Sequence, residues 1–548
     1  MSLPAFSTQS ELFSTAGLGQ SVFAPTDRYR LFAQTIFPLL AAARGQLVGC
    51  YAADNGRVAI EPVLLLGVSL LQYLEGLPDR QAVEMVRYHV GWNLALNRQV
   101  GDALFHPTTL VNFRQRLEAH GLSAVGFQLV LDALVAAGLV SRQSRQRLDS
   151  TQMFGQISRM SRLDCVRESL RLTLQELAAQ LAPAARPAWW LAVWECYVES
   201  QTDYRAGSEV LGRKLVAAGA DTARLLAWAR EPGGEPWPWG PQLLLLERVF
   251  GEQFNAGAST PAPKEKTDLP TDRVQNPHDP AATYAVKGTG AKKKEHVGYK
   301  VQVAETVTEA TLAPGEPTQN FLTGIATQAA HHSDEAGAVQ MQAEQTAMGL
   351  AKPPVQYVDG AYVSAQELVA AAAEGRSLMG PAALPPTLGG RHPTTAFDLQ
   401  VEQRRGVCPA GQVSTQCSRL VEQATGKVTF RFEWGSQCAA CPLRAQCVAP
   451  GQAHRSLVVG EHHSALQARR REQTTPAFLA AMKHRNAIEG TQSELVRAHG
   501  LRQARYRGLA KVRQQNYWAG AACNVKRWLR RQAWELTRAT AALVAAAS

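Results

Sequence analysis

The sequence predicts an α/β protein with a mixed sheet assembled from segments that are far apart in the chain. Three observations lead to this prediction. Apolar strands alternate with helices between residues 297 and 374, and a helical periodicity fills residues 26–145. The chain has 548 residues, more than one hydrophobic core usually holds, so several domains are expected.

The first domain is predicted to be all-helical. Residues 1–25 are rich in Ser, Gly and Pro and are expected to form a flexible arm, and residues 26–145 carry apolar residues at helical spacing. Near its end, Pro107 suits the first turn of a helix that carries Arg114 and Arg116. This helix is interpreted as either a DNA-recognition helix or a solvated helix in a packing domain. The domain would therefore serve DNA binding or dimerisation.

The sheet is expected to begin in the segment around Asp149. Strands are predicted over residues 297–306, 320–326 and the stretch ending at Asp359, with helices over 335–349 and 365–374. Residues 160–262 are interpreted as a helical insertion. The core is then divided into residues 146–159, 263–384 and 465–548, the last part forming basic C-terminal helices.

The charge balance indicates a polyanionic partner. Lys and Arg number 57 against 46 Asp and Glu, which gives a net charge of +11. Between residues 483 and 531 there are twelve Lys or Arg and two Glu, a balance that fits a phosphate backbone. The sequence shows neither a signal-peptide pattern nor an apolar run of about 18 residues, so a cytoplasmic protein without a membrane partner is expected.

Four of the nine cysteines have a spacing that favours zinc. Cys438 and Cys441 form a C-x2-C pair, with Cys408 before it and Cys447 after it, inside a Cys-rich insertion over residues 385–464. Four thiolates close a tetrahedral Zn²⁺ shell and leave no open position, so the predicted site is structural. The alternative is a set of reduced cysteines in a loop.

Three acidic residues stand in contexts that suit catalysis. Asp149 follows a helical region, Asp359 ends a short apolar strand in an Asp-Gly turn, and Glu489 is isolated among cations one helical turn after Arg485. Each also has a structural interpretation. Asp149 would cap a helix beginning at residue 150 or 151, Asp359 would serve the turn, and Glu489 would pair with Arg485.

Taken together, these segments resemble bacterial insertion-sequence transposases of the DDE type. The resemblance runs from about residue 26 to residue 531 and includes Leu148-Asp149-Ser150-Thr151, His278-Asp279-Pro280, Gly298-Tyr299-Lys300-Val301, Val358-Asp359-Gly360-Ala361-Tyr362, the Cys408 and Cys438–Cys447 cluster, Arg485–Gly490 and Arg502–Gly508. Related transposases place a Tyr three residues before the Arg and a Lys seven after the Glu. Here those positions hold Met482 and Val496, so the Lys role would pass to Arg497 or Arg502.

The resemblance implies a ribonuclease-H-like core with the Cys-rich insertion between the second Asp and the Glu. It also implies the activity: hydrolysis of phosphodiesters at element ends and joining of the 3′-hydroxyls to target DNA. Two Mg²⁺ ions, which Mn²⁺ can replace, would stabilise the attacking and leaving oxygens. Asp149 would bridge both ions, with Asp359 on one and Glu489 on the other, while Arg485 would orient a carboxylate or contact a phosphate.

The expected partner is double-stranded DNA, both the terminal repeats and the target, bound by a homodimer or larger assembly. The residues expected to contact it are Arg497, Arg502, Arg505, Arg507, Lys511 and Arg513, besides Arg114 and Arg116. Two alternatives remain at this stage. One is a catalytically silent DNA-binding protein derived from a transposase, and the other is a related ribonuclease-H-like nuclease that acts on RNA.

Overall fold

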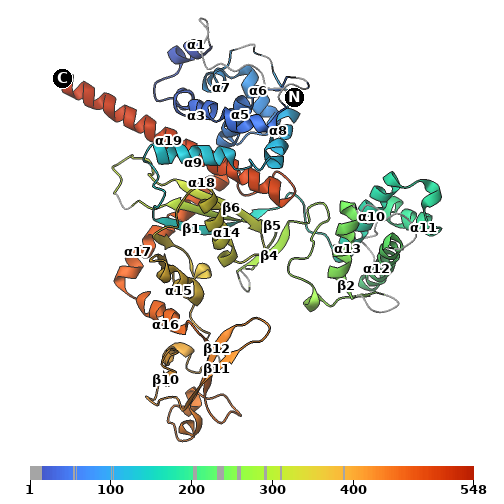
Figure 1. Ribbon diagram of the computed structural model, residues 1–548, viewed down its shortest axis with the longest axis vertical. Helices are drawn as coiled ribbons and strands as arrows, with labels where there is room; N and C mark the ends of the chain where they lie inside the picture. Colours follow the sequence, from blue (N-terminus) through green and yellow to red (C-terminus); the bar gives the residue numbers. More distant parts are fainter. Residues whose placement is uncertain are drawn as a thin grey trace.

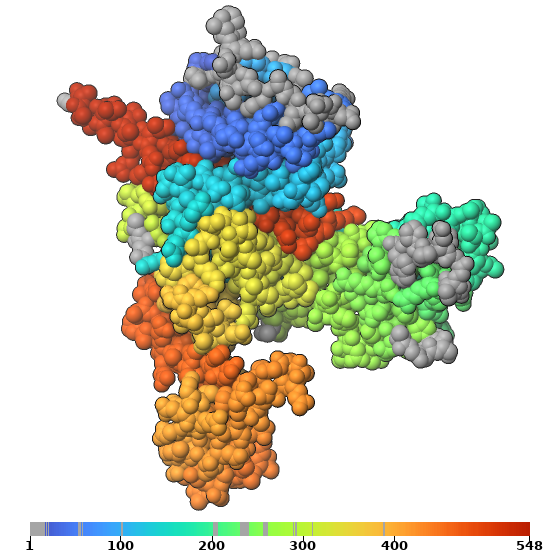
Figure 2. All heavy atoms as spheres, viewed as in Figure 1, coloured from blue at the N-terminus to red at the C-terminus, as the bar shows by residue number. Residues whose placement is uncertain are grey.

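A computed structural model describes residues 15–547 except 53–55, 57, 100–101, 103, 201–206, 231–239, 256–260, 289, 291–292, 309–310 and 387–388. It shows a central sheet beneath an N-terminal helical domain (Figure 1). A second group of helices projects to one side, and a small β-rich subdomain hangs below (Figure 2). The chain is therefore a mixed α/β protein, as the sequence predicts.

The central sheet has six strands, and β1 is the central one in the strand order, between β5 and β7. The strands are β1 (Gln146–Phe154), β4 (Thr283–Lys287), β5 (Lys294–Thr306), β6 (Leu322–Ala329), β7 (Val355–Tyr357) and β8 (Ser377–Met379). Antiparallel β5 pairs with β1 along one edge and with β4 and β6 along the other. Parallel pairing then runs from β1 to β7 and on to β8.

Strands β1 and β5 approach one another closely at Gly298. A Cβ at this position would lie 2.1 Å from the carbonyl oxygen of Met153, so only glycine fits. β1 continues unbroken through Ser150 and Thr151. The alternative in which Asp149 caps a helix beginning there is therefore wrong.

Helices cover both faces of the sheet. On one face, α14 (Asp334–Ala347) and α15 (Ala365–Ala373) enclose a small core with Leu148 and Met341. On the other, α19 (Leu509–Ala547) packs against β6, where Asn524 bonds both the backbone N–H and the carbonyl of Leu322 at 2.8 and 2.9 Å. Figure 1 shows the C-terminal part of α19 extending beyond the body.

The N-terminal domain is all-helical and shares its core with α19 and the sheet. Its helices are α1 (Thr15–Val22), α2 (Arg28–Leu31), α3 (Phe37–Ala42), α4 (Arg44–Leu47), α5 (Pro62–Glu75), α6 (Asp79–Tyr88), α7 (Val90–Ala95), α8 (Thr108–Ala119) and α9 (Val125–Ala136). Most of the expected arm, residues 1–14, lies outside the described residues, and α1 replaces it from Thr15 onward.

None of the described helices is by itself long and apolar enough to cross a membrane. One bent pair, Arg28–Ala42 with Arg44–Cys50, passes the length and composition test together, with a bend of 49°.

The helices after β1 form a unit with its own hydrophobic core. They are α10 (Arg162–Gln180), α11 (Trp190–Trp194), α12 (Ser208–Arg230) and α13 (Pro241–Gln253), followed by the short pair β2 (Phe254–Asn255) and β3 (Ala262–Pro263). Leu170, Leu174, Leu225 and Leu246 are buried at its centre. Figure 2 shows this unit standing out from the sheet.

The Cys-rich subdomain contains two small sheets. One pairs β9 (Asp398–Gln400) with β10 (Arg405–Val407), and the other has the order β11 (Gln416–Val421), β12 (Val428–Glu433) and β13 (Ser456–Gly460). Phe432 and Trp434 are buried in a core that includes Cys438 and Cys447.

Three helices return the chain from this subdomain to the sheet before α19. They are α16 (His463–Glu472), α17 (Pro476–Asn486) and α18 (Ile488–His499). The expectation that Arg485 and Glu489 lie on one continuous helix is wrong, because α17 ends at Asn486 and α18 begins at Ile488. The α17–α18 junction, residues 484–491, lies against β1 and carries both residues.

Candidate active site

Asp149 lies within β1, and Asp359 lies at the same level, two residues after the end of the neighbouring parallel strand β7. Arg147 of β1 is paired with Tyr357 of β7, and each aspartate follows two residues later. Asp149 is buried, and the side chain of Asp359 is 37% exposed. Asp359 also serves its turn, because its Oδ1 accepts the N–H of Ala361 at 2.9 Å. The pairing register therefore brings together two carboxylates that are 210 residues apart.

The guanidinium of Arg485 lies between these two carboxylates. Its Nη2 donates to Oδ2 of Asp149 at 2.9 Å and lies 3.8 Å from Oδ2 of Asp359. The other oxygen of Asp149 accepts the N–H of Ser150 at 2.8 Å. Arg485 thus places a positive charge against both aspartates, and its partners differ from the Glu489 considered in the sequence.

Glu489 lies in the first turn of α18 and is exposed. One turn later on the same helix, Gln492 donates to the carbonyl of Ser150 at 3.2 Å. The preceding helix reaches Asp149 through Arg485. Contacts to β1 from Arg485, before Glu489, and from Gln492, after it, therefore fix the first turn of α18 against the strand.

The environment of Asp149 works against ionisation of its carboxyl group. Burial raises the pKa above the ordinary value and Asp359 adds to the rise, whereas Arg485 and the Ser150 N–H lower it, with a raised pKa as the net result. A divalent cation beside both aspartates would favour their ionised forms. The arrangement has the chemistry of a hard-cation site, because carboxylate oxygens are preferred Mg²⁺ ligands.

The structure also contains a buried acid that the sequence analysis missed. Glu305 of β5 is fully buried beside Arg147, its cross-strand partner, with Nε and Oε1 at 2.6 Å. Arg527 of α19 donates to the other oxygen at 2.8 Å. The sequence did carry a signal, because Glu305 is the one acid in the strand predicted over residues 297–306, and such a residue must be paired when buried.

The basic residues predicted to contact DNA divide into two groups. Arg497, Arg502, Arg507 and Lys511 are exposed. Arg502 lies in the segment that pairs with the end of β1, where the N–H of Phe154 donates to the carbonyl of Arg502 at 2.9 Å and the N–H of Ala504 donates to the carbonyl of Phe154 at 2.8 Å. Arg507 donates to Oε1 of Gln156 at 3.2 Å, so two exposed cations lie close to the end of β1, where a phosphate backbone can reach them.

The second group is engaged inside the protein. Arg114 is buried, donates both terminal nitrogens to Asp79 and lies over the Tyr506 ring at 5.3 Å. Arg505 donates to the carbonyl of Leu77 at 3.0 Å, at the end of α5. Arg116 lies over the Tyr51 ring at 4.3 Å, and Arg513 is half-buried. The expectation of a DNA contact is corrected for Arg114, whose buried guanidinium holds the fold together through Asp79, whereas for the half-buried Arg505 the contact stays a prediction.

The four cysteines of the predicted zinc set line one small cavity, with Trp434 and Arg455 among the other lining residues. The sulfur of Cys438 accepts the backbone N–H of Arg455 at 3.5 Å. Cys417 lies on β11 and is not among the residues that line this cavity. The subdomain has a core of buried apolar side chains, so its stability does not rest on a metal alone.

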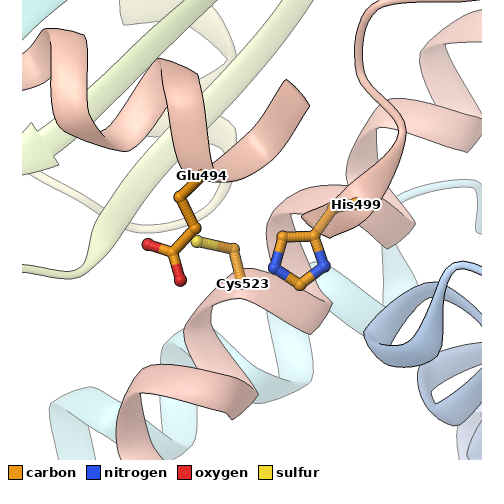
Figure 3. Close-up of side chains that lie close together, drawn as sticks. All are labelled: Glu494, His499 and Cys523. Carbon is orange, nitrogen blue, oxygen red and sulfur yellow. The ribbon is translucent and has the colours of Figure 1, made fainter. Parts of the chain in front are cut away.

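A different set of potential ligands is closer together. Glu494, His499 and Cys523 each have one potential ligand atom within 4.8 Å of those of the other two (Figure 3). Among the residues that the structure describes, this is the group of three His, Cys, Asp or Glu side chains that meets this distance. Asp149, Asp359 and Glu489 are not gathered to that distance.

The Glu494, His499 and Cys523 group is nevertheless a poor metal site. Both oxygens of Glu494 are paired, with Lys526 at 3.0 Å and Arg527 at 2.9 Å. Burial raises the pKa of the Cys523 thiol to about 12. Two cations and a protonated thiol oppose a further positive charge, so this cluster is better explained as packing around the Arg527 ion pairs.

Comparison with known families gives two matches. The transposase DDE domain matches residues 407–529, which include the Cys-rich subdomain from Val407 onward, Arg485 and Glu489. A transposase domain, DUF772, matches residues 20–116 in the helical N-terminal domain. No curated protein and no solved structure matches the chain. Matches to two transposase family models in one chain support an insertion-sequence transposase.

Proposed function

We propose that this protein cuts the ends of an insertion sequence by metal-dependent hydrolysis and joins the freed 3′-hydroxyls to target DNA. The observation that carries the proposal is the position of Asp149 in β1 beside Asp359, just after the adjacent parallel strand β7, with Arg485 against both. Apart from β4, which also pairs with β5, the strand order β6-β5-β1-β7-β8 is the one expected of a ribonuclease-H-like core: three antiparallel strands followed by two parallel ones. We therefore assign the sheet to that fold.

In this proposal Asp149, within β1, and Asp359, two residues after β7, hold one metal ion, and Glu489 of α18 holds a second ion together with Asp149. Mg²⁺ is the expected ion because it prefers carboxylate and water oxygens, and Mn²⁺ can replace it. When bound, two such ions stabilise the attacking and leaving oxygens at the scissile phosphorus. Glu489 is exposed, so its side chain is able to turn toward the aspartates while the α17–α18 junction keeps its place.

Arg485 has a defined role in the same site. Before metal binds, its guanidinium neutralises the two aspartates. Once a metal takes over those carboxylates, the guanidinium is free to contact a phosphate oxygen, for which its planar donor geometry is suited. The exposed Arg497, Arg502, Arg507 and Lys511 extend this positive surface for the backbone of double-stranded DNA, and two element ends call for at least a homodimer.

The Cys-rich subdomain is proposed to hold one structural Zn²⁺ through Cys408, Cys438, Cys441 and Cys447. Two observations support the fit. The four thiols share one cavity, and a backbone N–H already points at the sulfur of Cys438, a contact that stabilises a thiolate. Four sulfur ligands match the composition of closed structural zinc sites.

A strand-cleavage assay tests the proposed activity. Purified protein is incubated with double-stranded DNA that carries the ends of its own element, with Mg²⁺, with Mn²⁺ and with EDTA. We expect cleavage that requires metal and is lost in Asp359→Asn and Glu489→Gln, while DNA binding remains. Binding without cleavage by the wild-type protein would identify a silent DNA-binding derivative, and cleavage of RNA in place of DNA would identify a nuclease of another kind.

A further inference from the structure

Glu305 of β5 lies where four elements of the core meet. Its two carboxylate oxygens accept hydrogen bonds from Arg147 of β1, Thr491 of α18 and Arg527 of α19, all between 2.6 and 2.9 Å. The Glu305 side chain is 0% exposed and those of both arginines are 5% exposed. Every one of these contacts is long-range in the sequence, so Glu305 links β5 to β1, α18 and α19 through side chains.

Two of these links reach the α17–α18 junction. Arg147 uses a second nitrogen, Nη1, to donate to the carbonyl of His484 at 3.0 Å, directly before Arg485. Thr491, two residues after Glu489, donates to Glu305 and accepts from Arg527 at 2.8 Å. The junction that carries Arg485 and Glu489 is therefore held at both of its ends by groups bonded to one carboxylate.

The same network is attached to the strand that carries the first aspartate. Arg147 precedes Asp149 by two residues, so both side chains leave β1 on the same face. A rotation of the Arg147 side chain would break its hydrogen bond to the His484 carbonyl. It would also change the packing on the face of β1 that carries Asp149. The charge on Glu305 fixes Arg147, because a buried guanidinium needs a paired carboxylate.

We propose that Glu305 is a positioning residue: it aligns the α17–α18 junction with β1 so that Glu489 and the two aspartates can share metal. This inference rests on the proposed metal site and adds a fourth acidic residue to it, one that does not touch metal or DNA. It predicts that replacing Glu305 weakens metal binding by more than the loss of folding stability alone explains.

A matched control is available elsewhere in the chain. Glu252 of α13 is also buried and ion-paired, with Arg248 Nε at 2.7 Å, and it accepts the backbone N–H of Val274 at 2.8 Å. It lies in the helical insertion, which has its own core. Glu252→Gln therefore removes a comparable buried charge with the same substitution but leaves the junction untouched.

The experiment measures Mn²⁺ affinity of the full-length protein by calorimetry, with thermal unfolding recorded on the same samples. We expect Glu305→Gln to weaken Mn²⁺ binding by about tenfold, the lower end of what outer residues of metal sites contribute. Glu252→Gln should retain wild-type affinity. The milder Thr491→Val, which removes one hydroxyl of the network, should give a smaller loss and serves if Glu305→Gln does not fold.

The outcomes separate this inference from the proposed function. Asp149→Asn is measured in parallel, and if it retains Mn²⁺ affinity the metal site itself is refuted. If Asp149→Asn loses affinity while the folded Glu305→Gln and Thr491→Val retain it, the metal site stands and the positioning role is refuted. Equal losses in Glu305→Gln and Glu252→Gln would show an effect of stability alone and would also overturn the inference.

Discussion

Arg485 donates to Asp149 across 2.9 Å, between residues 336 positions apart in the chain. The contact joins the end of α17 to the central strand, and the same guanidinium nitrogen lies 3.8 Å from Asp359. A positive side chain thus lies where two negative ones converge. Any divalent cation that binds these aspartates must compete with it.

Removal of this competing charge should tighten metal binding. We expect Arg485→Gln to raise the affinity for Mn²⁺ at neutral pH by about three- to tenfold, a part of the Coulomb energy of such a pair at an effective dielectric constant of ~20. Strand cleavage should fall despite the tighter binding, because the contact to a phosphate is lost. Calorimetric titration together with the cleavage assay checks both effects, and weaker metal binding in Arg485→Gln would show that the arginine organises the site before metal arrives.

The raised pKa of Asp149 predicts a dependence on pH. Folding raises the pKa of Asp149 above its value in the unfolded chain, so stability falls as pH rises from the ordinary aspartate pKa through the raised one. Metal requires the ionised form. Mn²⁺ affinity should therefore fall, as pH is lowered, at a higher pH than an ordinary aspartate would give.

Arg485→Gln provides the test of this pH dependence, because Arg485 is the strongest influence that lowers the pKa of Asp149. The acid limb of the affinity profile should move to still higher pH in the variant. A profile that is identical in wild type and variant would show that another group controls the acid limb.

The cysteine cluster predicts a selective loss of zinc. Cys438→Ser should release about one Zn²⁺ per chain and lower the yield of folded protein, because the subdomain loses the metal's contribution to its folding. Cys417→Ser is the matched control, since Cys417 lies in the same subdomain but away from the four-thiol cavity. Metal analysis of the purified proteins decides, and a zinc-free wild type that folds normally would refute the site.

The two groups of arginines predict opposite phenotypes. Arg507→Ala should weaken DNA binding and reduce its salt dependence, because an exposed cation that contacts phosphate contributes to counterion release. Arg114→Ala should instead destabilise the fold by roughly 3 kcal/mol, as expected when a buried ion pair loses one partner. Both variants are compared by salt titration of DNA binding and by denaturant unfolding. An Arg114→Ala variant as stable as the wild type would contradict the division.

Local patterns in the sequence were enough to predict most of the sheet. The sequence predicts strands over 297–306 and 320–326, and the structure has β5 at Lys294–Thr306 and β6 at Leu322–Ala329. Both strands are largely apolar runs in the sequence. Buried strands require such runs, so the pattern can be recognised without the structure. Asp359 was placed correctly at the end of its strand for the same reason.

Side-chain partners across the fold could not be predicted in this way. Arg114 follows a helical pattern that does not reveal which side of the helix meets Asp79. Arg485 was matched with Glu489 because the two are close in the sequence, whereas its partners come from β1 and β7. Glu305 was passed over because a charge in an apolar strand becomes meaningful only when Arg147 and Arg527 are seen beside it.

The central claim is that Asp149, Asp359 and Glu489 together bind a pair of divalent metal ions, with Asp149 on both. Anomalous scattering from Mn²⁺ in crystals of the protein with element-end DNA tests it most directly. We predict two metal peaks at about 2.0–2.2 Å from carboxylate oxygens, one shared by Asp149 and Asp359 and one shared by Asp149 and Glu489, with Arg485 moved away from Asp149. A DNA-bound structure with Arg485 still between the two aspartates, and no metal signal there, would contradict the account.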